Sequence, residues 1–200
     1  MKKYPVVLSF LSAICLFFAA CAGGSGSLAD DLQKKAPQWD SSGDADIDAL
    51  GKRVWNLVEG SETRMNQFYD KYSKQIEYNK FQKTLSERGD ITEAALLAEM
   101  RNNGKGEEAD KVVAAANAFE NDFNALEIFL KETLSNPDVL RIPQEVKSIK
   151  SKLDSADMMV KLKLAKAAKN LGDGASYLSH ASGVISKLKK ANKALLAGAK

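Results

Sequence analysis

The chain has 200 residues, 44% of them hydrophobic and 28% charged, with a formal net charge of +3 at neutral pH. This composition excludes an intrinsically disordered chain, and the length suits one domain with a substantial core rather than two. Only four residues are proline and 13 are glycine, which favours helices over sheets.

The first twenty residues have the pattern of an export signal. Two lysines precede an apolar stretch, residues 5–20, which has the length of a signal-peptide core and is short for a membrane-spanning helix. The stretch ends in Phe18-Ala-Ala-Cys21, which resembles the lipobox of bacterial lipoproteins, although phenylalanine replaces the commonest leucine. The resemblance covers residues 1–27. It implies removal of residues 1–20, fatty acylation of Cys21 and attachment to a membrane of the bacterial cell envelope.

The residues around the predicted cleavage site fit a lipid anchor. Cys15 leaves with the leader, so Cys21 is the only cysteine of the mature chain and no internal disulfide can form. Residues 22–27 form a flexible spacer, and several acyl chains anchor a protein more durably than one. By the same resemblance, Ala22 after the cysteine favours the outer membrane in a cell with two membranes. An ordinary secretory signal with an incidental cysteine and an uncleaved anchor are the alternatives.

Residues 21–43 are predicted to be a flexible tether. A short helix is possible over 28–36, before Pro37, and the serine- and glycine-containing residues that follow indicate a loop. From Asp44 onward the helical signals are strong, so we expect residues 44–200 to form the folded domain.

The first long helical stretch begins at Asp44, whose short side chain can accept hydrogen bonds from free amides at a helix start. Apolar residues then recur at three- and four-residue steps as far as Leu85. Gly60 and Ser61 are a candidate break that would divide this stretch into two helices. Gly89 ends it.

Capping and turn signals divide the middle of the chain. Asp90-Ile-Thr-Glu93 has the spacing of a capping box and predicts a helix over 94–102, followed by a turn. The strongest helix prediction covers 107–135, where apolar residues lie on one stripe. Asn136-Pro137 ends this helix, and we expect Pro143 in the first turn of the next one.

The last sixty residues carry two interleaved seven-residue rows. One row is Val160, Ala167, Gly174, Ala181, Leu188 and Leu195, and the other is Leu164, Leu171, Leu178, Ile185 and Asn192. The small residues of the first row would let another helix approach closely. The two glycines of Gly172-Asp-Gly174 favour a break into two antiparallel helices, because together they cost about 2 kcal/mol relative to alanine in a continuous helix.

No strand-like alternation of useful length occurs. We therefore predict an all-α protein, an elongated antiparallel bundle of four to six helices with coiled-coil-like packing, in which residues 44–200 form a single domain.

Charge is divided along the chain. From Leu28 to Leu140 there are 14 Lys and Arg against 22 Asp and Glu, whereas from Arg141 to Lys200 there are 13 against four. We expect the acidic part to pack beside the basic part, with the charges on solvated rims. The alternative is that the basic end meets an anionic lipid surface or a partner. For that contact the candidates are Lys187, Lys189, Lys190 and Lys193, which lie among apolar residues.

Metal, cofactor and nucleic-acid sites are not indicated. Asp40, Asp44, Asp46 and Asp48 lack the glycine and final glutamate of a calcium loop. His180 is the only histidine, so it cannot supply the usual zinc ligands. A haem bound by His180 and one of Met65, Met100, Met158 and Met159 is the cofactor alternative. The basic region carries no interleaved aromatic series for stacking on bases.

The aromatic stretch from Phe68 to Phe81 mixes predicted core and surface positions. Phe68 and Tyr72 belong to the core stripe, whereas Tyr69 and Tyr78 lie off it and are candidates for a binding surface.

No pair of residues can be nominated as a catalytic acid and base. We therefore expect a lipid-anchored envelope protein that is not an enzyme and binds another macromolecule, for which an envelope protein is the expected partner. A membrane-active protein using its basic C-terminal helices, and a carrier or enzyme with a ligand between helices, are the alternatives.

Overall fold

The computed structural model describes Leu32 and residues 34–199, and within them it contains six helices and no strand. The prediction of an all-α bundle is confirmed. The leader, Cys21 and the spacer lie outside the described residues. The helices are α3 (Ala45–Tyr72), α4 (Ile76–Arg88), α5 (Glu93–Asn102), α6 (Gly106–Leu134), α7 (Pro137–Leu153) and α8 (Met158–Gly198).

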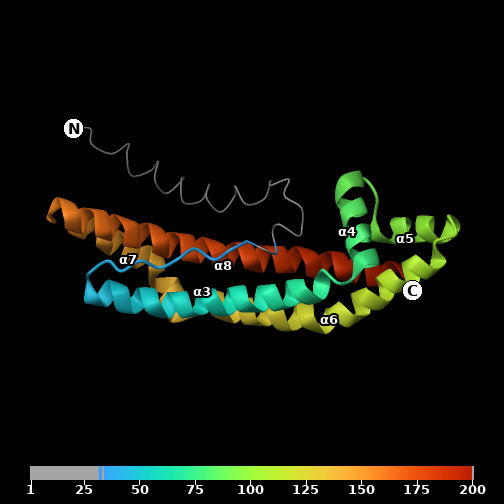
Figure 1. The fold of residues 1–200 in the computed structure, drawn as a ribbon, viewed down its shortest axis with the longest axis horizontal. Helices are drawn as coiled ribbons and strands as arrows, with labels where there is room; N and C mark the ends of the chain where they lie inside the picture. Colours follow the sequence, from blue (N-terminus) through green and yellow to red (C-terminus); the bar gives the residue numbers. More distant parts are fainter. Residues whose placement is uncertain (1–31, 33, 200) are drawn as a thin grey trace, which may run out of the picture.

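The longest helix, α8, has 41 residues and is about 60 Å long at 1.5 Å per residue. Helices α6 and α7 follow one another along it in the opposite direction, and α3 runs beside them in the same direction as α8 (Figure 1). Helix α4 lies across the axis of the bundle, and α5 extends beyond the end of the bundle. The bundle is therefore elongated, with a transverse head at one end.

Two apolar clusters fill the bundle, and α8 contributes to both. The cluster beside α7 contains Ile47, Leu50, Val54, Val58, Val139, Ile142, Ile149, Leu164, Ala167, Leu171, Tyr177 and Leu178. The larger cluster, toward the head, joins residues of α3, α4, α5, α6 and the second half of α8. Apart from Val160, every residue of the two predicted seven-residue rows is buried, so α8 faces the core along its length.

The predicted break at Gly172-Asp-Gly174 is wrong, because α8 continues through it. At Gly174, which is buried, a Cβ atom would lie 3.2 Å from Trp55 and 3.4 Å from Val58. Packing of α3 against this site compensates for the low helix propensity of glycine. Nothing lies within 4 Å of a Cβ atom at Gly172, so that residue has no comparable packing role.

Helix α3 is also continuous across the candidate break at Gly60 and Ser61. The hydroxyl of Ser61 is buried and donates to the carbonyl of Leu57 at 2.8 Å. A polar side chain that bonds to its own helix in this way can be buried without leaving its hydroxyl unsatisfied. The helix starts as predicted, because the Asp44 carboxylate accepts hydrogen bonds from the amides of Asp46 and Ile47.

Two predicted helix starts are shifted. The cap of α5 is Thr92 rather than Asp90, and its hydroxyl accepts from the amide of Ala95 at 3.2 Å. Helix α7 begins at Pro137, because Asn136 caps it by accepting from the amide of Asp138. Pro143 therefore lies inside α7 and not in its first turn.

The segment 34–43 lies along the bundle, although the sequence placed it in a flexible tether (Figure 1). It is not helical, so the predicted helix over 28–36 does not include residues 34–36. The amide of Ala36 donates to Glu62 at 3.1 Å, and the Trp39 ring packs against Trp55 at 5.8 Å between centroids. A Cβ atom at Gly51 would overlap the Trp39 ring, so glycine makes room for it.

Gly172 and Gly174 in α8 provide a direct test of this packing. Replacing Gly174→Leu should destabilise the protein by about 1–3 kcal/mol, because the new side chain must displace Trp55 or Val58. Replacing Gly172→Ala should instead stabilise it by about 0.5–1 kcal/mol, since the space is open and alanine is the better helix former. Urea denaturation followed by circular dichroism measures both. A loss of stability at residue 172, or none at residue 174, would contradict the packing described here.

Candidate functional site

The head is formed by α4 and α5, which are joined by a tight turn. Gly89 ends α4 with a φ of +48°, a left-handed conformation that favours glycine, and its amide donates to the carbonyl of Leu85. The guanidinium of Arg88 donates to both carboxylate oxygens of Glu99, at 2.9 and 2.8 Å, and so joins the two helices. These contacts fix the position of α4 relative to α5, and both helices line a surface hollow.

The hollow has a volume of about 480 Å³, and its surface is more polar than apolar: a floor of a few apolar side chains lies within a charged rim. Phe81 and Leu96 are buried on the floor, and Met100 is partly buried beside them. The rim carries both signs of charge: Lys80, Lys83, Arg88 and Lys105, with Glu77, Glu87, Glu99 and Glu108. An apolar floor within a rim of mixed charge suits a protein or peptide surface. Sequence reasoning did not find this hollow, because its lining comes from three helices.

A buried polar contact holds the head onto the bundle. The hydroxyl of Tyr78 donates to Oδ1 of Asn192 at 2.9 Å, and Nδ2 of Asn192 donates to the carbonyl of Ala116 at 2.9 Å. The two side chains are only 1% exposed. This chain of bonds ties together α4, α8 and α6, three elements that are distant in sequence.

The interpretation of Tyr78 as a surface residue is therefore wrong. Because α4 crosses the bundle, its stripe does not continue that of α3, and Tyr78 points into the core. Its ring makes edge contacts with Tyr72 and Phe119, at 5.7 and 5.4 Å between centroids. Burial raises the pKa of Tyr78 above its usual value. Tyr69, the other candidate, is partly buried against the larger cluster.

The four candidate lysines near the C-terminus do not form one free surface. Lys187, Lys190 and Lys193 are exposed, whereas Lys189 lies 2.5 Å from Glu127 and its side chain is 19% exposed. Hydrogen bonds from Lys189 and then from Lys131 hold the pKa of Glu127 below its usual value. The apolar neighbours Val184, Ile185, Leu188 and Leu195 are all buried. Insertion of this segment into lipid would therefore require the bundle to open.

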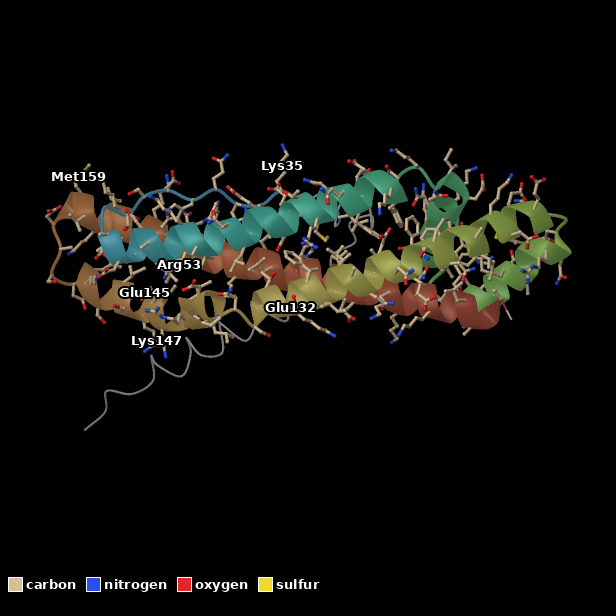
Figure 2. All side chains as sticks on the ribbon, turned by 90° about the horizontal axis from the view of Figure 1, so that it is seen from below. Lys35, Arg53, Glu132, Glu145, Lys147 and Met159 are labelled. Carbon is tan, nitrogen blue, oxygen red and sulfur yellow. The ribbon has the colours of Figure 1, made fainter. Side chains whose placement is uncertain are left out.

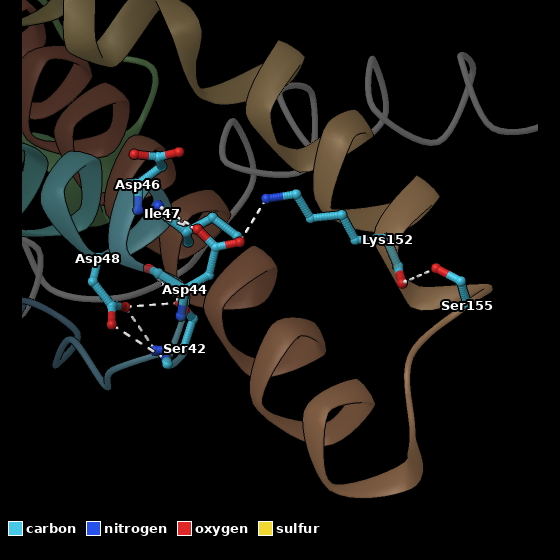
Figure 3. Close-up of polar contacts among 8 residues, drawn as sticks. Ser42, Asp44, Asp46, Ile47, Asp48, Lys152 and Ser155 are labelled. Atoms are coloured by element: carbon cyan, nitrogen blue, oxygen red, sulfur yellow. Dashed lines mark hydrogen bonds and ion pairs between the residues drawn. The ribbon is translucent and has the colours of Figure 1, made fainter.

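Ion pairs join the acidic and basic parts of the chain, which confirms the prediction that the two pack together. Lys152 bonds to Asp44 at 2.6 Å, and Lys166 lies 2.9 Å from Asp40. The bond from Lys152 lowers the pKa of Asp44, and the same contact raises the pKa of Lys152 (Figure 3). These pairs are partly exposed, so each contributes little alone, but together they favour this arrangement of helices.

The aspartates near Asp44 serve as caps and not as a calcium loop. Asp48 accepts hydrogen bonds from the amide and the hydroxyl of Ser42 (Figure 3). It also accepts from the amide of Gly43 and the hydroxyl of Ser41. Among residues 34–199 and Leu32, no group of three or more His, Cys, Asp and Glu side chains is placed to hold a metal ion.

The structure separates two of the four candidate methionines from His180. His180 is partly buried on α8, and Met158 and Met159 lie more than twenty residues earlier on the same helix, or about 30 Å away. Met65 is buried in the larger cluster, and Met100 lines the hollow of the head. The methionines of α8 therefore cannot share one haem with His180.

Within the described part of the chain, every helix is too short or too polar to span a bilayer. Comparisons with family models, with curated proteins and with solved structures find no match to this chain.

The polar contact under the head can be tested by a double-mutant cycle. Asn192→Ala should destabilise the protein by about 2–4 kcal/mol, because it leaves the buried Tyr78 hydroxyl without its acceptor and removes the second hydrogen bond to the Ala116 carbonyl. Tyr78→Phe should lower the free energy of unfolding by about 1–2 kcal/mol. The double variant should lower it by less than the sum of the two single effects.

Asn117→Ala is the matched control, since exposed Asn117 bonds only to its own helix and its loss should change stability by less than about 0.5 kcal/mol. Strictly additive effects of Asn192→Ala and Tyr78→Phe in urea denaturation would show that the two side chains are not coupled.

Proposed function

We propose that this chain is a lipid-anchored protein of the bacterial cell envelope that acts without catalysis, by binding another protein through the hollow of its α4–α5 head. The observation that carries the proposal is the combination of an apolar floor and a mixed-charge rim in that hollow. A binding site for a small ion would carry mainly one sign of charge. A site for a protein segment must match charges of both signs and apolar side chains.

The state of the rim also favours a protein partner. Arg88 pairs with Glu99 at 2.8 Å, Lys80 with Glu77 at 3.0 Å, and Lys83 with Glu87 at 3.7 Å. These pairs are exposed, so each stabilises the rim only weakly and leaves most of its hydrogen-bonding capacity open. The charged groups of the rim can therefore form new pairs with a partner protein.

The anchor rests on the resemblance of residues 1–27 to bacterial lipoproteins. Acyl chains on Cys21 would restrict the search for an envelope partner to the membrane surface, which raises its effective concentration. Ala36 contacts Glu62 on the side of α3, and the fifteen peptide steps from Cys21 to Ala36 span at most about 50 Å. A membrane-bound cysteine can therefore hold the whole bundle close to the bilayer.

Lipidation predicts a defined chemical modification. Mass spectrometry of the native protein should find a chain that begins at Cys21 and carries acyl groups on it, and detergent should be needed to extract the protein from membranes. Cys21→Ser should abolish the modification and prevent processing at this site. An unmodified Cys21 thiol or a retained leader in the native protein would refute the proposed anchor.

Binding by the head predicts position-dependent crosslinking in intact cells. A photoreactive amino acid at Lys83 or Glu87, both exposed beside the hollow, should yield a discrete crosslinked envelope protein. The same amino acid at exposed Lys131 or Glu132 on α6 is the control and should yield none or much less. Equal products from all four positions, or none from the head, would argue against this surface. The readout is the crosslinked band and its identity.

A further inference from the structure

Exposed apolar side chains are concentrated at the start of α8, at the opposite end of the bundle from the head. Met158, Met159 and Leu162 are 74%, 67% and 61% exposed, and Val160 is 40% exposed. The remaining large hydrophobic residues that are exposed in the described chain, Ile76, Ile128 and Leu140, lie on three other helices. The cluster on α8 therefore differs from the isolated apolar residues that occur on most protein surfaces.

These side chains point away from the core. At 100° per residue, Met158, Met159 and Leu162 fall on one side of α8. Leu164, Ala167 and Leu171, which are all buried, fall on the other side. Figure 2 shows Met159 near one end of the bundle, and its side chain is 67% exposed. From Met158 to Leu162, α8 thus has a second apolar face that no described helix covers, on the side opposite its core face.

Positive charge flanks the second face. Lysines occupy positions 161, 163, 166 and 169, and no acidic residue lies between Met158 and Lys169. Lys166 pairs with Asp40, and Lys169 pairs with Asp173 at 2.6 Å. Lys161 and Lys163 are exposed and form no ion pair with the residues that the structure describes. Their ammonium groups lie beside the apolar side chains.

Several acidic groups around this end are already engaged. Asp157 caps α8 by accepting from the amide of Val160, and Asp44 bonds to Lys152. Asp48 accepts four hydrogen bonds from the segment 41–43. Asp154, which is exposed in the turn before α8, forms no ion pair with the described residues. From Met158 to Lys163, α8 itself carries only apolar and cationic side chains.

We propose that Met158, Met159, Lys161, Leu162 and Lys163, here called the tip surface, dock on a bilayer that contains anionic phospholipid. The methionine and leucine side chains would enter the boundary between headgroups and acyl chains, and the two lysines would lie over the phosphates. A second copy of the chain is a poorer occupant, because two tip surfaces would bring like charges together. The position at the end of the bundle lets the surface meet a flat bilayer without obstruction.

Docking by the tip surface has a consequence for orientation. Helix α8 runs about 60 Å from the tip surface to the head, so the bilayer contact and the hollow of the head lie near opposite ends of the molecule. The anchor permits this arrangement. Ala36 lies beside Glu62, which is about 25 Å along α3 from the first residue of that helix. The chain between Cys21 and Ala36 is long enough to span this distance.

The test uses residues 22–200, which lack the leader and Cys21 but retain every residue of both apolar clusters. Flotation at low salt would compare vesicles of phosphatidylcholine alone with vesicles that contain about one quarter phosphatidylglycerol. We expect binding to the anionic vesicles and a loss of about tenfold or more on the neutral ones or in high salt. Absence of binding to the anionic vesicles, or equal binding to both compositions, would overturn the proposal.

Variants assign the binding to the tip surface. Substituting Met158→Gln, Met159→Gln and Leu162→Gln together, or Lys161→Gln with Lys163→Gln, should reduce vesicle binding by about tenfold or more. The matched control is Ile128→Gln with Leu140→Gln, which removes exposed apolar groups elsewhere and should bind as the unmodified chain does. Circular dichroism and urea denaturation should be unchanged in all three. Full binding by either tip variant would overturn the proposal, even if the head still crosslinks to its partner.

A protein partner for the tip surface is the competing outcome. In intact cells a photoreactive amino acid at Met159 should crosslink to lipid, and a discrete protein product in its place would overturn the assignment to a bilayer. Since the head is tested at Lys83 and Glu87, failure of one surface does not imply failure of the other.

Discussion

Close packing between α3 and α8 at Gly174 is the contact on which the rest of the bundle depends. A larger residue there would separate the helices, because Trp55 and Val58 already lie at contact distance from the position of a Cβ atom. With α3 in place, α8 stays helical through two glycines and reaches both apolar clusters. Helices α6 and α7 can then lie end to end along it. The stability of α8 is therefore a property of its packing rather than of its own sequence.

Polar contacts decide how the remaining elements attach. The Tyr78–Asn192–Ala116 chain places α4 across the end of the bundle, and this crossing creates the hollow of the head. An unsatisfied polar group in the core is costly, so this arrangement is preferred over a helix that merely continues α3. At the other end, ion pairs from Lys152 and Lys166 hold the start of α3 and the preceding segment beside α7 and α8. Both ends of the bundle are thus specified by interactions between distant parts of the chain.

The two ends differ in chemistry, and the proposed function follows from that difference. The head has an apolar floor and charges of both signs, which suits a protein surface. The tip surface has exposed methionines and leucine beside lysines, which suits anionic lipid. With acyl chains on Cys21, the protein would contact the membrane through its lipid and through the tip surface. The C-terminal lysines are less suited to lipid insertion, because the apolar residues around them form the core.

The sequence by itself determined the fold class, the start of α3, the helix ends between Arg88 and Leu134, and the core face of α8. These depend on local signals: the periodicity of apolar residues, the cap at Asp44, the helix stop at Asn136-Pro137, and the absence of strand-like alternation. It placed Asn192 in a core row but could not identify Tyr78 as its partner. Continuity of α8 through Gly174, burial of Tyr78, attachment of the segment 34–43 and the hollow of the head were decided only by the tertiary structure. Each requires contact between residues that are distant in the chain, and the free energy of such packing exceeds the local preferences on which the predictions relied.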